Sequence, residues 1–200
     1  MNRTFIEALA NRRSYYGISN RSPITAVELE KRIQQTIENL PSTNNSQSTR
    51  LVLLYGENHQ KLWDIVKEVL RNMMKPDKSF ERTEKKINAF AAGYASVLFY
   101  EDMKIVEALQ EQFPTYATRY PIWSEHTSAM HQIAVWTLLE DSGFGASLQH
   151  YNPIIDDLVQ KQFDIPEKWH LIAQMPFGIP TETPGEKTVI PPSEKILIFR

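Results

Sequence analysis

The sequence predicts a single domain of the α+β class, built from helices and short strands in mixed order. Segments whose apolar residues recur with helical spacing are interspersed with short continuous apolar runs that are typical of strands. These segments do not follow the regular strand–helix alternation of a doubly wound parallel sheet. The 200 residues contain neither a linker nor an internal repeat, so residues 1–200 are expected to form one domain.

Six helices are expected from their apolar spacing and from the residues at their ends. Thr25 is a typical N-cap, and Glu28 three positions later completes the pattern of a capping box. Pro41 and Pro76 are expected to end the second and third helices. The longest pattern has a wide apolar sector, which is typical of a central helix or of a helix in a dimer interface. The expected helices cover residues 4–11, 25–40, 59–74, 103–112, 122–142 and 154–163.

Four short apolar runs predict strands. The first run ends at Gly56 and is expected to be buried. The last run stands alone at the end of the sequence, after a loop rich in Pro and Thr. The expected strands cover residues 51–55, 95–100, 169–177 and 196–199.

The composition argues against several classes of protein. The absence of cysteine rules out disulfides, zinc–thiolate sites and thiol catalysis. A formal net charge of −2 with scattered Lys and Arg argues against nucleic-acid binding. No apolar run is long enough to span a membrane. Residues 1–11 lack the apolar stretch of a signal peptide, so a cytoplasmic protein is expected.

Motifs for common kinds of catalysis are also missing. Gly143 and Gly145 match the first two positions of a dinucleotide-binding fingerprint, but they follow a helix, and Leu148 replaces the third glycine. His126 and His131 are five positions apart in the sequence, which does not suit a helical zinc pair. Both are interpreted as ordinary surface or partly buried histidines, and no metal site is expected.

Two basic segments have the groups that bind a phosphate. Arg12, Arg13 and Ser14 offer two planar guanidinium groups and a hydroxyl at the end of the first expected helix. Lys187, in the loop before the last strand, would add another positive charge. Taken alone, each segment is more typical of exposed basic residues at a helix end or in a loop.

Two further segments suit a flat polar ligand. Residues 41–48 are rich in Ser, Asn and Gln, and their amides match the alternating N–H and C=O groups of a flavin's pyrimidine edge. An ordinary polar loop has the same composition. Gly143 suits a helix C-cap, whereas Gly145 has no such explanation and would permit close approach of the backbone to a ligand.

In this order and at these spacings, the four segments resemble the nitroreductase family over essentially the whole chain. Family members have Arg-Arg-Ser after a short helix and Pro-Ser-x-x-Asn-x-Gln before the first strand, which residues 41–47 match here. They continue with Gly-x-Gly after the long helix and a basic residue in the late loop. The stretch 143–153 contains a Gly-Ala-Ser-Leu-Gln-His-Tyr-Asn-Pro run that resembles a bacterial and fungal subgroup.

The resemblance implies an α+β sandwich around a mostly antiparallel sheet, in a homodimer whose C-terminal segments each add a strand to the partner's sheet. It also implies bound FMN, with NADH or NADPH as electron donor and flavin N5 as the reactive centre, so that no catalytic side chain is required. The resemblance also implies which residues bind FMN. The phosphate would be held by Arg12, Arg13, Ser14 and Lys187, and the ribityl chain and ring by Ser42 (of either subunit), Asn45 and Gln47. Flavin O4 and N5 would lie near the backbone of Phe144 and Gly145.

Tyr16 departs from the family pattern. Many relatives have Lys or Arg at this position, near flavin N1 and O2, where negative charge gathers on reduction. A neutral phenol stabilises that charge less than a cation does. The flavin potential is therefore expected to be lower than in those relatives, unless another cation compensates.

The activity that the resemblance implies is NAD(P)H-dependent reduction of nitroaromatic or quinone-type acceptors. Four aromatic residues before the long helix form either a lid over the flavin, which favours flat acceptors, or part of a subunit interface. Two other functions fit the same sequence: a flavin-binding sensor or regulator with little turnover, and a cofactor-free module that binds partners through its long helix. The four aromatic residues are Phe113, Tyr116, Tyr120 and Trp123.

Overall fold

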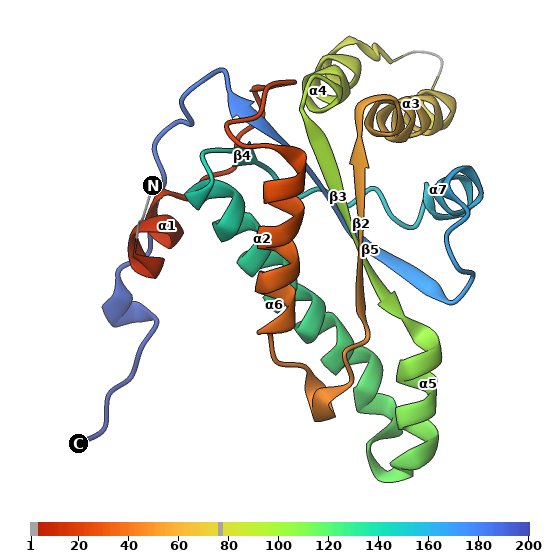
Figure 1. Ribbon diagram of the computed structural model, residues 1–200, viewed down its shortest axis with the longest axis vertical. Helices are drawn as coiled ribbons and strands as arrows, with labels where there is room; N and C mark the ends of the chain where they lie inside the picture. Colours follow the sequence, from red (N-terminus) through yellow and green to blue (C-terminus); the bar gives the residue numbers. More distant parts are fainter. Residues whose placement is uncertain (1–3, 76–77) are drawn as a thin grey trace.

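An antiparallel sheet lies between two layers of helices in the computed structural model, which describes residues 4–75 and 78–200 (Figure 1). Its strands are arranged in the order β1-β5-β3-β2, and β4 adds a short pairing to β5. The mixture of helices with an antiparallel sheet confirms the predicted α+β class. The strands are β1 (Ile18–Ser19), β2 (Thr49–Tyr55), β3 (Ala95–Asp102), β4 (Gly145–Ala146) and β5 (Trp169–Pro180).

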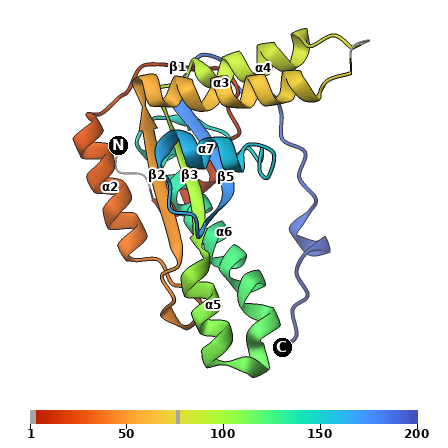
Figure 2. The same cartoon turned by 90° about the vertical axis from the view of Figure 1, so that its right-hand side faces the viewer.

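The helices divide between the two faces of the sheet (Figures 1 and 2). One face packs against α2 and the long helix α6, and the other packs against α3, α4 and α7. The helices are α1 (Phe5–Asn11), α2 (Ala26–Glu38), α3 (Gly56–Met73), α4 (Glu81–Ala91), α5 (Met103–Gln112), α6 (Tyr120–Asp141) and α7 (Asp156–Phe163), with 3-10 turns η1 (Thr43–Asn45), η2 (Pro114–Arg119) and η3 (Pro192–Glu194).

Side chains along β3 alternate between two hydrophobic cores. Val97 and Phe99 belong to the core under α2 and α6, whereas Leu98 and Tyr100 belong to the core under α3, α4 and α7. This is the two-residue period of a strand whose faces are both covered. Burying each such side chain contributes roughly 1.5–3 kcal/mol. β3 therefore stabilises both cores.

The helix ends follow the local signals in the sequence. Thr25 caps α2 by accepting a hydrogen bond from the backbone N–H of Glu28 at 3.1 Å. The Glu28 carboxylate pairs with Arg32 at 2.6 Å, so the structure shows one of the two bonds of the predicted capping box. Gly143, just beyond α6, has a φ of +87°, which confirms its expected role at the helix C-terminus. α3 ends at Met73, and Pro76 lies outside the described residues.

Several elements differ from the expectations. Helix α4 was not predicted, and β1 and β4 are too short, at two residues each, to leave a periodic pattern. The strand expected to be buried at 51–55 is β2, at the edge of the sheet, where Leu54 is its one fully buried residue. Most of the apolar side chains of β2 are therefore only half-buried by the rest of the chain.

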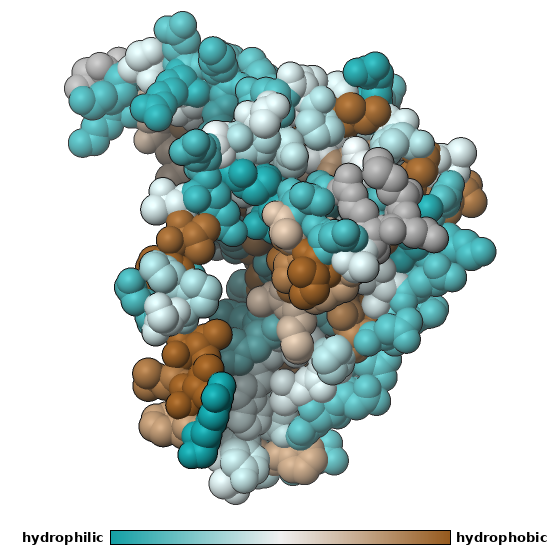
Figure 3. Space-filling view, turned by 90° about the vertical axis from the view of Figure 1, so that its left-hand side faces the viewer, coloured by the Kyte–Doolittle hydropathy of each residue, from teal (hydrophilic) through white to brown (hydrophobic). Residues whose placement is uncertain are grey.

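The expected strand at 196–199 does not form within the described chain. The residues after η3 extend away from the body as a tail (Figures 1 and 2). Leu197 is 82% exposed and Phe199 is 90% exposed, because no strand edge of the same chain lies beside them. On the same side of the molecule, Phe5 and Ile6 of α1 are also largely exposed, and hydrophobic areas are visible there in Figure 3.

Across residues 4–75 and 78–200, none of the helices is both long enough and apolar enough to cross a membrane.

His59 is a buried histidine, and its environment generates a prediction for stability at low pH. Nδ1 lies 2.9 Å from the Ser96 hydroxyl, and Nε2 lies 3.2 Å from the Ala91 carbonyl oxygen. Burial lowers the pKa of His59 to about 4, below the ordinary value of 6.5. As the pH falls from 6.5 towards 4, the unfolded chain takes up a proton that the native chain does not.

The free energy of unfolding should therefore decrease over this range, by at most about 3 kcal/mol from His59. Denaturant unfolding at several pH values measures this decrease, and His59→Gln should flatten it. His126→Gln, at an exposed position of α6, serves as the control and should keep the wild-type slope. Parallel slopes for wild type and His59→Gln would show that His59 does not cause the decrease.

Candidate functional site

The first and third sequence segments meet beside β4. Ser14 forms a parallel bridge to Ala146, and the Tyr15 N–H donates to the Ala146 carbonyl at 2.9 Å. A Cβ atom on Gly145 would lie 2.7 Å from Cγ of Tyr15. Gly145 is therefore required by the close packing of two segments of the same chain, an explanation that the sequence alone did not offer.

The first segment also meets the fourth. The Arg13 guanidinium donates to the Gly185 carbonyl oxygen, from a position 172 residues away in the sequence. Arg13, Ser14 and Tyr16 share a hollow of about 430 Å³ with residues 182–186. Lys187 follows this loop and is exposed. Three of the four predicted segments are thus brought to one end of the molecule.

Arg12 lies apart from this hollow. Its guanidinium is 4.4 Å from the ring centroid of Trp136, so it stacks on α6. Burial and the neighbouring charge of Arg13 lower the pKa of Arg12. The two adjacent arginines therefore have different environments: Arg12 packs between α1 and α6, while Arg13 faces the hollow.

Tyr16 has a cation beside it. Nζ of Lys86, on α4, is 5.7 Å from the Tyr16 ring centroid, and the Tyr16 ring packs against Phe90. The phenol is 46% exposed, so it lies at the surface of the hollow. Lys86 was not singled out in the sequence, because nothing in its spacing connects it with residue 16.

The side chain of Phe144 is buried in the core next to this end of the molecule. Its ring is 2% exposed and packs edge-on against Phe177, with ring centroids 5.1 Å apart. This packing keeps Phe144, the residue before Gly145, in the core under α6.

The second sequence segment forms a strained loop before β2. Asn44, Asn45 and Gln47 have φ values of 50°, 52° and 48°, in the left-handed region that non-glycine residues rarely adopt. Each such residue costs on the order of 1 kcal/mol, and strain of this kind is concentrated at functional sites. The loop is held by the Ser42 hydroxyl, which accepts from the Gln47 N–H at 2.9 Å, and by Asn44, which donates to the Tyr120 hydroxyl at 2.7 Å.

A buried carboxylate anchors the end of this loop. Glu101, near the end of β3, is 1% exposed and accepts hydrogen bonds from Ser48 at 2.6 Å and Thr49 at 2.5 Å. Burial raises the pKa of the Glu101 carboxyl, and the two hydrogen bonds oppose that rise. Arg50 also forms an ion pair with Asp102 at 3.1 Å. The sequence alone does not indicate a role for Glu101, because Ser48 and Thr49 lie about 50 positions away in the chain.

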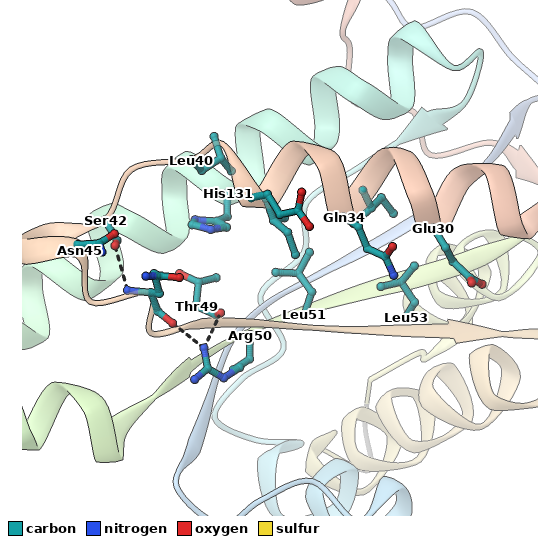
Figure 4. Close-up of a pocket in the computed structure, with 14 residues that line it drawn as sticks. Glu30, Gln34, Leu40, Ser42, Asn45, Thr49, Arg50, Leu51, Leu53 and His131 are labelled. Atoms are coloured by element: carbon teal, nitrogen blue, oxygen red, sulfur yellow. Dashed lines mark hydrogen bonds between the residues drawn. The ribbon is translucent and has the colours of Figure 1, made fainter.

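The loop forms one end of a hollow of about 640 Å³ between α2 and β2 (Figure 4). This volume is within the range of small-molecule sites. Ser42, Asn45 and Gln47 line it together with His131, which reaches in from α6. Apolar residues of α2, the following loop and β2 form half of the remaining lining, and polar or charged residues such as Glu30 and Arg50 form the rest. These apolar residues are Ile33, Ile37, Leu40, Leu51 and Leu53.

The two groups of site residues lie at opposite ends of α6. Thr43 donates its N–H to the Thr127 hydroxyl at 3.4 Å, near the beginning of the helix, whereas Gly145 follows its end at Asp141. At 1.5 Å per residue, Thr127 and Asp141 are about 21 Å apart along the axis. A single chain therefore does not bring all four predicted segments to one place.

Aromatic residues before α6 and in its first turn form a cluster at the same end of α6 as the strained loop. The Tyr120 and Trp123 rings are 5.3 Å apart, and Phe113 and Tyr116 pack against them. Tyr120 is buried and Tyr116 is 53% exposed. In the described parts of the chain, no group of three or more His, Asp or Glu residues is placed to hold a metal ion.

Comparison with known proteins gives consistent matches along the chain. A model of the nitroreductase family matches residues 9–179. The nitroreductase FRM2 of Saccharomyces cerevisiae is 32% identical over 188 residues, covering 93% of each chain.

The nitroreductase CinD of Lactococcus lactis, solved in complex with nicotinic acid, is 37% identical, with a TM-score of 0.91 over 98% of this chain and 100% of that one. CinD has also been solved with chloramphenicol and with 4-nitrophenol. A protein of Exiguobacterium sibiricum, solved with FMN, is 12% identical, with a TM-score of 0.74 over 100% of this chain and 99% of that one; this likeness shows the fold alone.

The packing at Gly145 generates a prediction for stability. Gly145→Ala should lower the free energy of unfolding by about 1–3 kcal/mol, because the added methyl group overlaps the Tyr15 side chain. Gly185→Ala is the matched control, since a Cβ atom there meets nothing within 4 Å. Denaturant unfolding of the three proteins measures the difference. Equal stability for both variants would mean that Tyr15 moves aside without cost.

Proposed function

The chain belongs to the nitroreductase family and is an oxidoreductase of nitroreductase type, and from that premise we propose that it binds FMN and uses NADH or NADPH to reduce nitroaromatic or quinone-type acceptors. The observation that carries this proposal is the meeting of Arg13 with the loop at 182–186 and of Ser14 with Ala146. Residues 13–16 and 182–186 thereby line one polar hollow, and the segment at Gly145 packs beside the first of them.

Arg13 and Ser14 of this hollow suit the phosphate of FMN. Glu182 and Glu186 also line it, and the Glu182 carboxylate accepts a hydrogen bond from the Gly17 N–H at 2.9 Å. Arg13 offers a planar set of N–H donors, Ser14 offers a hydroxyl, and the exposed Lys187 adds a positive charge on the same loop. Arg12 would contribute through its charge while its guanidinium stacks on Trp136. The backbone at Phe144 and Gly145 would then lie close to the flavin ring.

The loop at 42–47 suits the ribityl chain and the ring. No described residue hydrogen-bonds to the side chains of Asn45 and Gln47, and both line the hollow beside Ser42. This loop lies about 21 Å along α6 from the hollow that contains Arg13 and Ser14. One chain would therefore supply the loop, and a second chain would supply the phosphate site. The proposed flavin site is therefore formed by two copies, in a homodimer with two sites.

The exposed apolar surface supports such a homodimer. Ile196, Leu197, Ile198 and Phe199 of the tail are 60–90% exposed, as expected for a segment that is covered by another chain. β2 has a free edge with unpaired backbone groups, which an added strand would satisfy. We infer that the tail of one copy pairs with the sheet of the other.

FMN, when bound, would supply the hydride-transfer chemistry between NADH or NADPH and the acceptor. The protein's own residues would bind the phosphate and hold the ring in place. The apolar lining of the hollow and the aromatic cluster at residues 113–123 would exclude water and favour flat acceptors. The ligands nicotinic acid, chloramphenicol and 4-nitrophenol in CinD support an aromatic substrate class.

Three measurements on the purified protein test the proposed function. A visible spectrum with flavin bands, before or after addition of FMN, is expected. Sedimentation should give the mass of a dimer. Steady-state oxidation of NADH and NADPH with a nitroaromatic or a quinone should show turnover. Flavin binding without turnover would instead support a sensing or regulatory role, and a protein that FMN cannot colour would overturn the proposal.

Arg13→Ala should weaken FMN binding about 10- to 100-fold, because charge-assisted hydrogen bonds contribute about 1.5–3 kcal/mol. Riboflavin, which lacks the phosphate, should bind Arg13→Ala and wild type equally. Arg82→Ala, at an exposed position of α4, removes the same charge elsewhere and should leave FMN binding unchanged. Equal losses of FMN and riboflavin binding would place Arg13 away from the phosphate.

Lys86 and Tyr16 generate a prediction for the flavin potential. Tyr16→Lys should raise the potential, because a second cation would stabilise the negative charge of the reduced flavin. Lys86→Ala should lower it, if the cation beside Tyr16 takes over that role. Anaerobic spectral titration against a reference dye measures both. An unchanged potential in both variants would show that neither position reaches the flavin ring.

A further inference from the structure

His131 is held in one orientation and one tautomer. It lies on α6, is 7% exposed, and its Nδ1 is 2.9 Å from the Thr127 carbonyl oxygen one helical turn earlier. A carbonyl oxygen only accepts hydrogen bonds, so Nδ1 carries the proton. Burial lowers the pKa of His131, which favours the neutral ring. In this tautomer Nε2 has a free lone pair and is a pure acceptor.

Nε2 of His131 has no hydrogen-bond partner among the residues that the structure describes. The ring lines the hollow between α2 and β2, and Figure 4 shows it reaching from α6 into that space. His59 provides a contrast, because both of its ring nitrogens have partners in the core. Because the ring lines this hollow, a ligand that enters it can donate an N–H or O–H to this free acceptor.

The neighbours of His131 indicate which kind of ligand edge would fit. Asn45 and Gln47 line the same hollow, and each side-chain amide has N–H donors. A ligand that presents carbonyl groups on both sides of an N–H would pair with amide donors and with the imidazole acceptor together. The pyrimidine edge of a flavin has this arrangement, with N3–H between the carbonyls at positions 2 and 4.

We propose that His131 is a positioning residue that accepts a hydrogen bond from flavin N3–H. This assignment rests on the proposed FMN function and gives His131 a role that its sequence context did not suggest. The strained backbone at Asn45 and Gln47 supports it, because it places their side chains at the end of the hollow that His131 faces.

The test compares FMN with 3-methyl-FMN, in which a methyl group replaces the N3 proton. His131→Phe should weaken FMN binding about tenfold, the equivalent of one hydrogen bond of about 1.4 kcal/mol. Wild type should bind 3-methyl-FMN at least tenfold more weakly than FMN, and His131→Phe should bind the two flavins with similar affinity. His131→Gln, whose amide oxygen is an acceptor, should recover part of the preference for FMN.

His126→Phe is the matched control, because His126 lies on the same helix but is exposed. It should keep the wild-type affinities for both flavins. Dissociation constants come from the quenching of flavin fluorescence, and thermal unfolding confirms that each variant folds. Unchanged FMN affinity in a folded His131→Phe variant, or equal losses for both flavins, would overturn the inference. Failure of wild type to bind any FMN would instead overturn the proposed function.

Discussion

Both helix layers of this protein pack against one strand, β3, which is paired along both edges and buried on both faces. Its alternating side chains enter two separate cores, so a change in its register would move apolar groups from one core to the other. The positions of α6 on one face and of α3 and α4 on the other are therefore linked through this strand. Both parts of the candidate site depend on that arrangement.

The end of β3 also determines the conformation of the loop before β2. Glu101 is buried where β3 leaves the core, and its two carboxylate oxygens hold Ser48 and Thr49. These bonds keep the preceding loop in place although three of its residues have left-handed backbone conformations. The stability of the sheet offsets the cost of that strain, and the loop is organised before any ligand binds.

The long helix α6 separates the two halves of the candidate site. The strained loop at residues 42–47 contacts the first half of α6. The hollow that contains Arg13 lies beyond the last residue of α6. The apolar tail and the free edge of β2 lie on the same chain but do not meet within it. In the proposed homodimer, a symmetric pair of copies would bring these features together by the same operation.

Local signals in the sequence determined the class of the fold and most of its elements. Apolar spacing predicted six of the seven α-helices of the described chain to within a few residues, and Gly143 marked the end of α6, because these features depend on neighbours three or four positions away. The ordered motifs pointed to the nitroreductase family and to candidate residues that include Arg13, Ser14 and Gln47.

Only the tertiary structure decided what those residues contact. It placed Arg12 on Trp136 and Arg13 in the hollow, explained Gly145 through the Tyr15 side chain, and brought Lys86 beside Tyr16. It also distinguished His131, with one nitrogen unpaired, from the fully paired His59. These distinctions depend on contacts between residues far apart in the sequence, and local patterns carry no information about such contacts.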